Sequence, residues 1–513
     1  MKAQKKLAAR VWDAVFGPQP KTEKRHAAAR TNRLNSGWTT QPTGANYETR
    51  MSLSVLIARA REAARDSLHI VNYLRLMRSN VIGQTGIGLQ CRARLKNGKL
   101  NLKLNSRIEE AWWEWTHAEN CTVSGGHDWK GVQDLAVTQC ETDGAFLIQM
   151  IEDAPNPFGF SLKLWDVTWL DPTFNVTVPG RNRILMSVEI DADNKPVAYW
   201  MTTPQSETEY TPQQSQVRWR IPAEQIIHNF QHRAASQVQG IPGIAPALLP
   251  AKNAYSYEES VIMAARHCVN DFAVLKNTTP DADADWDGAE NDDGSPNHPL
   301  IDSAPLSITA LLPGWEMEWR DAKHPTQNHP AFSQTLDMKI AASLGVPYFL
   351  LIGDWTAVNF SSSRGGLGEF RERCRGYQAF IATTLCRRVF HAWLRAAWLT
   401  GKIEITAAEY QELQNPTWQP RGFDYVDPKK DVETDILQLQ YRLKTPSQIA
   451  LERGEDYLDQ LERWQSDEQL AKAKGRDINA IYSPKQAAAA PPDGEDDPPD
   501  DTEKPKKPDD GED

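Results

Sequence analysis

The most constraining feature of the chain is a helix, turn, loop and helix between residues 337 and 395. A helical run over 338–344 stops at Gly345, and Pro347 cannot continue its hydrogen-bond ladder. Residues 348–360 then predict a loop. A chain with this order must place two helices at the two ends of one short connection.

The second of these helices is predicted to be long. Residues 364–399 contain no proline, and they would span about 50 Å as one continuous helix at 1.5 Å per residue. The serines at 361–363 are expected to cap its start, because hydroxyl groups satisfy the free N–H groups there. Four glycines predict a flexible or kinked first half, namely Gly365, Gly366, Gly368 and Gly376.

Length and composition favour a folded protein of several lobes. The 513 residues suggest two to four domains or one elongated subunit, and 40% hydrophobic residues with 18 Trp are enough to bury real cores. The six Cys show no C-x-x-C pair and no Cys/His spacing, which indicates buried thiols in a reducing compartment rather than a zinc site or disulfides. No run approaches 18 apolar residues, so we expect no membrane span. The basic first 16 residues lack the apolar core of a secretion signal.

The formal net charge of −11 is unevenly distributed. Residues 1–50 carry ten bases and three acids, and residues 1–45 predict a basic flexible arm. This arm either contacts nucleic acid or an assembly partner, or is a solvated tail. Residues 491–513 carry eleven acids and three lysines, and residues 483–513 predict a disordered acidic tail.

An acidic segment lies at residues 281–293. Asp283, Asp285, Asp287 and Gly288 occupy positions 1, 3, 5 and 6 of an EF-hand loop, but position 12 is Gly294 and not glutamate. A solvated loop is therefore favoured over a calcium site, and no metal or other cofactor is expected.

The first half of the chain predicts an α+β lobe. Residues 52–81 have helical spacing, and the glycines at 83–88 indicate a turn into a strand over 89–94. These glycines do not form a phosphate loop, because a helix precedes them and no Lys-Ser/Thr follows. A Trp-rich helix over 108–117 is expected to pack in the core rather than to stack on bases. Further segments are a helix over 128–137 and strands over 145–151, 161–169, 186–190 and 197–202.

The second half predicts mainly helices. One helix is expected from residue 246 to about residue 275, with His267 and Cys268 as packing residues. Two strands, over 306–312 and 315–319, would flank the Pro313-Gly314 turn. After the long helix, three shorter helices are expected over 432–442, 446–453 and 457–474, the middle one capped by Thr445.

No catalytic constellation stands out. The sequence has no G-x-S-x-G, no H-E-x-x-H and no G-K-S/T motif. The long helix is rich in arginine, which indicates a solvated or intersubunit ion-pair face or, less often, contacts with DNA. Its arginines include Arg364, Arg371, Arg375, Arg387 and Arg388.

Several phrases together resemble the lambda-type bacteriophage portal proteins. They are L-G-V-P-Y at 344–348, G-D at 353–354, and V-N-F-S-S-S-R at 358–364. N-V-I-G at 80–83 and L-D-P at 170–172 are also similar to the family in the same order. Gly365 and Gly366 depart from it, because alanine is commoner there.

The resemblance implies an elongated α+β portal fold that assembles as a ring. It implies a wing over 46–245, a first stem helix over 246–275 and a clip with the acidic loop over 276–328. A second stem helix over 329–347 and a tunnel loop over 348–360 would follow. A long channel helix over 361–400 and a wing return with a helical crown over 401–482 would complete the subunit.

The resemblance also implies a function and partners. About twelve subunits would form a ring at one capsid vertex, the channel through which double-stranded DNA is packaged and ejected without sequence specificity. Partners would be the terminase large subunit, major capsid and scaffold proteins and head-tail connector proteins, with no membrane. The subunit would be no enzyme, and would lie in the virion after assembly in the host cytoplasm. The tunnel-loop candidates for approaching DNA are Gly353, Asp354, Trp355, Thr356, Asn359 and Arg364.

Two alternatives remain open from the sequence. One is a nucleic-acid-binding scaffold or assembly protein that uses the basic arm and forms no ring. The other is a metal-dependent enzyme that uses the acidic segment. Oligomeric state distinguishes the first alternative from a portal, and metal-dependent turnover distinguishes the second.

Overall fold

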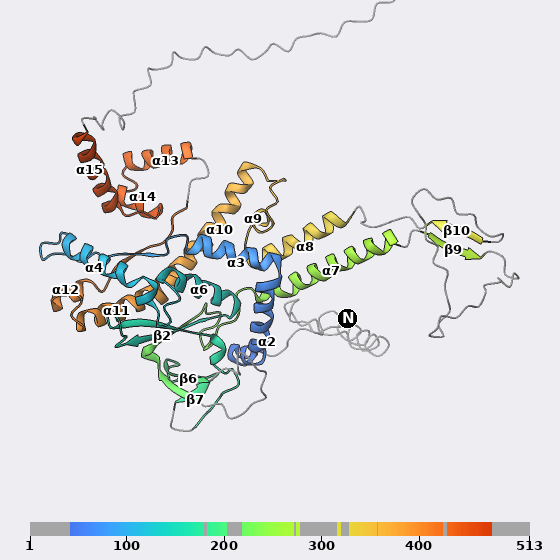
Figure 1. Ribbon diagram of the computed structural model, residues 1–513, viewed down its shortest axis with the longest axis horizontal. Coiled ribbons are helices and arrows are strands. Elements are labelled where there is room, and N and C mark those ends of the chain that lie inside the picture. The colour runs from blue at the N-terminus through green and yellow to red at the C-terminus, as the bar shows by residue number, and fades with distance from the viewer. Residues whose placement is uncertain are drawn as a thin grey trace, which may run out of the picture.

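The computed structural model describes residues 42–178, 182–202, 218–270, 273–277, 315–319, 328–356, 358–423 and 428–474. These residues form a lobe of helices packed on small antiparallel sheets, a two-helix projection, and a group of C-terminal helices (Figure 1). The fold is therefore mixed helix and sheet, as predicted. The basic arm up to residue 41, the acidic segment at 281–293, the predicted strand at 306–312 and the acidic tail lie outside the described residues.

Two helices open the lobe. α2 (Ala45–Asp66) and α3 (Leu68–Val81) are separated by Ser67, whose backbone is extended. The glycine-rich segment after α3 is a turn, as predicted, and leads into β1 (Gly88–Gln90), which is shorter than expected. α3 is buried along one face, so it lies at the centre of the lobe.

Tryptophans form the centre of the main core. α4 (Leu102–Trp115) is followed by the single-turn α5 (Ala118–Cys121) and α6 (Trp129–Thr142). The ring of Trp112 lies 4.8 Å from that of Trp115 and 5.0 Å from that of Trp393. The prediction that this helix packs its aromatic face is thus confirmed.

Two antiparallel sheets complete the lobe. The first has the strand order β3-β2-β8, and the second has the order β4-β5-β6-β7 with its own smaller core. The 3-10 turns at Val167–Trp169 and Ala223–Gln225 follow β3 and β7. The strands are β2 (Phe146–Glu152), β3 (Phe160–Trp165), β4 (Arg183–Leu185), β5 (Val188–Ile190), β6 (Pro196–Thr202), β7 (Arg218–Pro222) and β8 (Ile226–Asn229).

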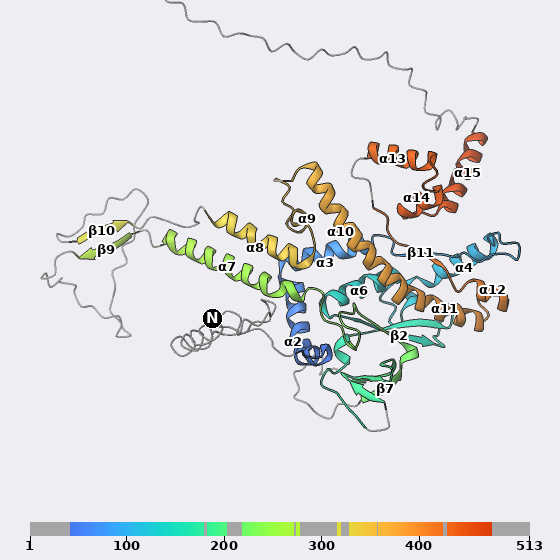
Figure 2. The same ribbon diagram turned by 180° about the vertical axis from the view of Figure 1, so that it is seen from behind.

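A two-helix projection leaves the lobe. α7 (Ala245–Asn270) and α8 (His329–Leu344) lie side by side, with β9 (Ala273–Asn277) and β10 (Trp315–Trp319) at the far end (Figures 1 and 2). β9 pairs antiparallel with β10. The predicted helix to residue 275 is wrong, because the alternating residues of β9 pair with a strand distant in the sequence and the helix ends at Asn270.

The long helix is continuous but not uniform. α10 (Phe360–Ile381) passes through a π-helical turn (Ala382–Cys386) into α11 (Arg387–Leu399). The glycines at 365, 366, 368 and 376 lie in regular helix, and the irregular turn lies in the second half of the long helix; the predicted flexibility of the first half stays a prediction. The irregular turn coincides with Thr384, whose hydroxyl bonds back to the Phe380 carbonyl and whose own carbonyl accepts from Asn229.

The C-terminal segments return to the lobe and then leave it. α12 (Ala407–Glu412) is followed by β11 (Thr417–Gln419), which pairs antiparallel with β1. α13 (Pro428–Gln440), α14 (Pro446–Glu452) and α15 (Tyr457–Ala473) come next, and Thr445 caps α14 with a capping box, as predicted. Among the described residues of these three helices, only Ile449 and Ala450 are buried.

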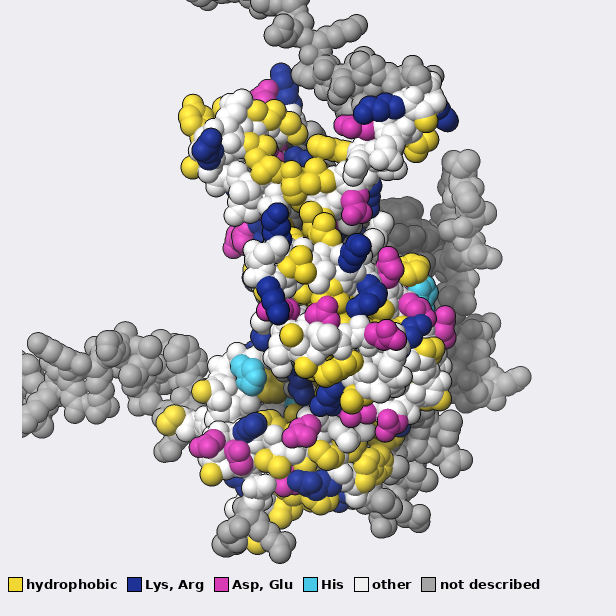
Figure 3. Space-filling model, turned by 90° about the vertical axis from the view of Figure 1, so that its left-hand side faces the viewer, with side chains coloured by type: hydrophobic (Ala, Val, Ile, Leu, Met, Phe, Trp, Pro, Cys, Tyr) yellow, Lys and Arg dark blue, Asp and Glu magenta, His cyan; other side chains and the backbone are white. Residues whose placement is uncertain are grey.

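The surface shows no large area of one charge on the side where α4 and α15 lie. Figure 3 shows acidic and basic side chains interspersed over this face. Within the described ranges, no helix combines the length and apolarity that a membrane span needs.

Candidate functional site

The site begins where α8 ends. Gly345 has φ +62°, a left-handed conformation that glycine adopts without strain, so the chain turns sharply there. The guanidinium of Arg373 on α10 donates to the carbonyl of Leu344 and, at 2.9 Å, to the hydroxyl of Tyr73. The turn predicted from the sequence is confirmed, and the side chain that binds it comes from the long helix.

Arg373 in turn belongs to a buried polar group. The Tyr73 hydroxyl donates to Oε2 of Glu141 at 3.0 Å, and Glu141 is only 3% exposed. Burial raises the pKa of Glu141, and the charge of Arg373 opposes that rise. α3, α6, α8 and α10 therefore meet at one network of hydrogen bonds.

The connection between α8 and α10 is partly helical. Tyr348–Ile352 forms the short helix α9, so the expected loop begins with a helical turn. Gly353 ends it with φ +80°. Asn72 on α3 donates to the carbonyls of Leu350 and Leu351, which would otherwise lack partners at the helix end.

The exposed part of the connection is ordered by Asp354. Its Oδ1 accepts from the backbone N–H of Thr356 at 3.0 Å and from the Thr356 hydroxyl at 2.6 Å. These hydrogen bonds lower the pKa of Asp354, so the carboxylate is charged at neutral pH. The Trp355 ring lies 5.0 Å from that of Phe349 and is 53% exposed. A large aromatic side chain is thus presented to solvent beside a fixed negative charge.

Asn359 has a structural role at the start of α10. Its side-chain oxygen accepts from the N–H of Ser362 at 2.8 Å. The prediction that the three serines cap this helix is wrong, because the asparagine before them reaches the free N–H first. The amide of Asn359 is therefore engaged by its own helix.

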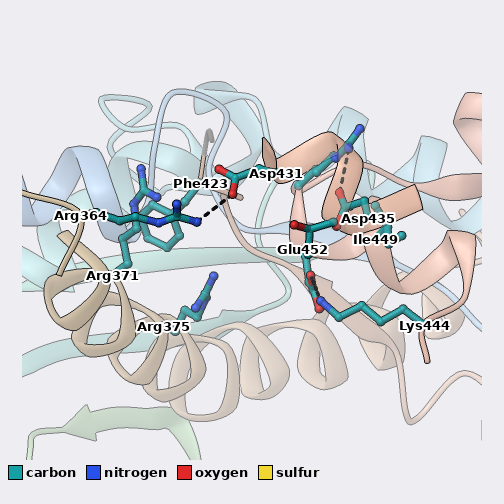
Figure 4. Close-up of a pocket in the computed structure, with 12 residues that line it drawn as sticks. Arg364, Arg371, Arg375, Phe423, Asp431, Asp435, Lys444, Ile449 and Glu452 are labelled. Atoms are coloured by element: carbon teal, nitrogen blue, oxygen red, sulfur yellow. Dashed lines mark hydrogen bonds and ion pairs between the residues drawn. The ribbon is translucent and has the colours of Figure 1, made fainter. Parts of the chain in front are cut away.

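Three of the predicted arginines lie on one face of α10. Arg364, Arg371 and Arg375 are separated by seven and four residues, which places them along one side of a helix. They line a cavity of about 330 Å³ between α10 and the C-terminal helices α13 and α14 (Figure 4). Arg364 pairs with Asp431 on α13 at 3.0 Å.

The floor of this cavity is Phe423. The guanidinium carbons of Arg371 and Arg375 lie 5.4 Å and 5.5 Å from the centre of its ring, within the range of cation–π attraction. Arg421 lies 6.0 Å from the same centre. Sequence reasoning missed Phe423 as a site residue, although its position two residues after Arg421 and before the C-terminal helices was a usable signal.

The other two arginines do not join the cavity. Arg387 is exposed on α11, and Arg388 is half-buried in the lobe. Burial lowers the pKa of Arg388, and the nearby Tyr199 opposes this shift. The structure thus divides the predicted arginine set into a cavity group and a lobe group.

The described part of the chain does not meet the requirements of a metal site. Its His, Cys, Asp and Glu side chains form no group of three that could hold a metal ion.

Comparisons with known proteins agree with one another. Residues 31–378 match the model of the family described as phage portal protein, lambda family. The probable portal protein of Halomonas phage phiHAP-1 is 28% identical over 444 residues, which cover 85% of each chain. Portal protein B of Escherichia phage lambda is 25% identical over 157 residues, 29% of this chain and 30% of that protein.

Among solved structures, chains of gene transfer agent particles align with most of this chain. A chain of the virion of the native particle covers 80% of this chain and 99% of its own length, with a TM-score of 0.42 and 12% identity. The family match itself extends over more than half of the present sequence. This chain belongs to the lambda family of phage portal proteins.

Proposed function

We propose that about twelve copies of this portal protein form a ring at one capsid vertex, with a central channel for the genome. The number twelve follows from the family resemblance. The observation that carries the proposal is the elongated subunit, whose two-helix projection stands away from the lobe with a β-hairpin at its end (Figure 1). Identical subunits joined head to tail by a closing rotation form rings.

The proposed roles follow the order of the chain. The lobe over 46–245 is the wing, and residues 246–270 and 329–347 are the stem helices that carry the clip. Residues 361–400 are the channel helix, and residues 401–482 are the wing return and crown. In support, α7 and α8 form a pair, and α13–α15 stand apart from the main core.

The tunnel loop over 348–360 is the segment that we expect to approach DNA. Its exposed part presents Trp355 beside Asp354 and Thr356, and Gly353 and Asn359 fix its two ends. The indole N–H of Trp355 suits a contact with the phosphate backbone, which carries no sequence information, whereas the charged Asp354 orders the loop through Thr356. A channel through which DNA moves requires contacts that are sequence-neutral.

The partners are proposed from the same role. The ring docks the terminase large subunit, which hydrolyses ATP, during packaging, and afterwards the head-tail connector proteins. Major capsid and scaffold proteins surround it during assembly in the host cytoplasm. The subunit itself is structural and has no cofactor.

Mass photometry with negative-stain imaging of the purified full chain tests the ring. We expect particles of about twelve times the mass of one chain, with a central hole of the width of a DNA duplex. A monomer that persists at high protein concentration and in the presence of scaffold and capsid proteins would exclude the ring.

A further inference from the structure

The arginine face of α10, defined by Arg364, Arg371 and Arg375, lies in an unusual electrostatic setting. Two of these arginines and Arg421 place their guanidinium carbons within 6.0 Å of the centre of the Phe423 ring, namely Arg371, Arg375 and Arg421. Like charges this close repel one another, and the repulsion is relieved when an anion lies among them.

Carboxylates from the C-terminal helices supply part of that negative charge. Asp431 pairs with Arg364 at 3.0 Å, and Asp435 pairs with Arg453 at 3.0 Å. Lys444 pairs with Glu452 at 2.7 Å. The residues lining the cavity thus carry five cations and three carboxylates. Glu372 pairs with Arg375 and adds a fourth carboxylate, so the net charge at the cavity is still positive.

A close backbone contact joins the helices that carry these carboxylates to the segment that precedes them. The backbones of Gly422 and Gly454 come so close that a Cβ on Gly454 would lie 2.5 Å from the Gly422 nitrogen. Beyond this contact, α13 and α14 bury only Ile449 and Ala450 among their described residues. The Arg364–Asp431 ion pair links α13 to the arginine face, and little apolar burial accompanies it.

We propose that the cavity is a binding site for the phosphodiester backbone of duplex DNA, covered by the carboxylates of α13 and α14. Phosphate oxygens compete with Asp431 for the guanidinium group of Arg364 and with Asp435 for that of Arg453, because a guanidinium group binds both kinds of oxygen in the same geometry. When DNA occupies the arginine face, α13 moves away about the Gly422–Gly454 contact. This inference rests on the proposed function and adds to it a defined phosphate site and a movable cover.

Because phosphate and carboxylates compete, substitutions of the arginines and substitutions of the aspartates are expected to change DNA affinity in opposite directions. Removing Arg371 and Arg375 removes phosphate contacts, so it weakens DNA binding and lowers its dependence on salt. Removing the charges of Asp431 and Asp435 removes the competitor, so it tightens binding. If these ion pairs only stabilised the fold, the two kinds of substitution would not change DNA affinity in opposite directions.

The experiment measures the affinity of a fluorescently labelled duplex of about two helical turns for the full-length protein over a range of salt concentrations. In R371Q/R375Q we expect the slope of log K against log salt to fall by about 2, since each phosphate contact contributes about 1. In D431N/D435N we expect binding about tenfold tighter at low salt, from two fewer competing charges. Hydrogen exchange over residues 428–440 is expected to rise when duplex is added.

Matched variants separate local effects from net charge. K96Q/K99Q removes two exposed cations far in sequence from the cavity, and E404Q/E412Q removes two exposed acids. All variants are compared only if their assembly mass and melting temperature match the unsubstituted protein. We expect that inorganic phosphate, added at equal ionic strength, does not displace the duplex. If it does displace the duplex, the site binds free phosphate instead of DNA.

The outcomes distinguish the two proposals. If the unsubstituted protein binds duplex, but R371Q/R375Q keeps its salt slope or D431N/D435N binds no tighter than E404Q/E412Q, the inference is wrong and the channel role stands. If the unsubstituted protein forms no ring and binds no duplex at any salt concentration, the proposed function itself fails.

Discussion

His228 gives the lobe a measurable dependence on pH. It lies on β8, opposite Leu147 of β2, and is only 8% exposed between the rings of Tyr199 and Phe230. Burial lowers its pKa from 6.5 to about 4, although contact with Gln239 opposes the shift. The folded lobe therefore holds this imidazole neutral under conditions in which an unfolded chain would protonate it.

The sign and size follow from linkage. Because the folded pKa of His228 is depressed, its full contribution to stability is present above about pH 6.5 and is lost as the pH falls toward about 4. The whole difference corresponds to roughly 3 kcal/mol, at 1.36 kcal/mol for each pKa unit. Between about pH 7.5 and pH 5 the expected loss is roughly 2 kcal/mol.

Hydrogen exchange of β2 amides measures this loss, because opening of β2 exposes His228. We expect the free energy of opening to fall by about 2 kcal/mol more in the unsubstituted protein than in H228Q over this pH range. H127Q, at an exposed histidine, is the control for the substitution. Equal pH slopes for the unsubstituted protein and H228Q would refute the reasoning, because other titrating groups are common to both.

Two further predictions concern the long helix and the lobe. N359A is expected to destabilise the start of α10 by about 1 kcal/mol through loss of its N-cap, and N359D to retain the cap, as read by hydrogen exchange. G243A would place a Cβ 2.2 Å from Oε2 of Glu141. We expect this to reduce the free energy of unfolding by about 1–3 kcal/mol, measured as a lower melting temperature. G365A, with no atom within 4 Å of its Cβ, is expected to stabilise α10 by about 0.5–1 kcal/mol and is the matched control.

The sequence predicted those parts of the fold that depend on neighbouring residues. The end of α8 at Gly345 and the cap of α14 at Thr445 each need only a few consecutive side chains. The strand partner of β10 was not predicted, for the opposite reason. Its pairing with β9 joins segments about forty residues apart, and no local periodicity encodes which distant strand is chosen.

The candidate site shows the same limit. The sequence identified Arg364, Arg371 and Arg375 because they lie on one predicted helix. It did not identify Asp431, which is 67 residues from its partner Arg364, or Phe423 beneath the other two arginines. A charged helix face is visible in a sequence, but the segment that covers it is decided by the tertiary fold.

The connection between α8 and α10 is positioned by side chains from other parts of the chain. Arg373 donates to the carbonyl of Leu344 at the end of α8, and Asn72 donates to that of Leu351 at the end of α9. Gln378 donates in the same way to the end of α3 at 3.2 Å. Carbonyl groups at helix ends lack partners within their own helix, so these donors fix three helix ends to one another. The exposed residues between them are therefore held by the core of the lobe, and a substitution at Arg373 would displace the loop without removing any group that the loop presents.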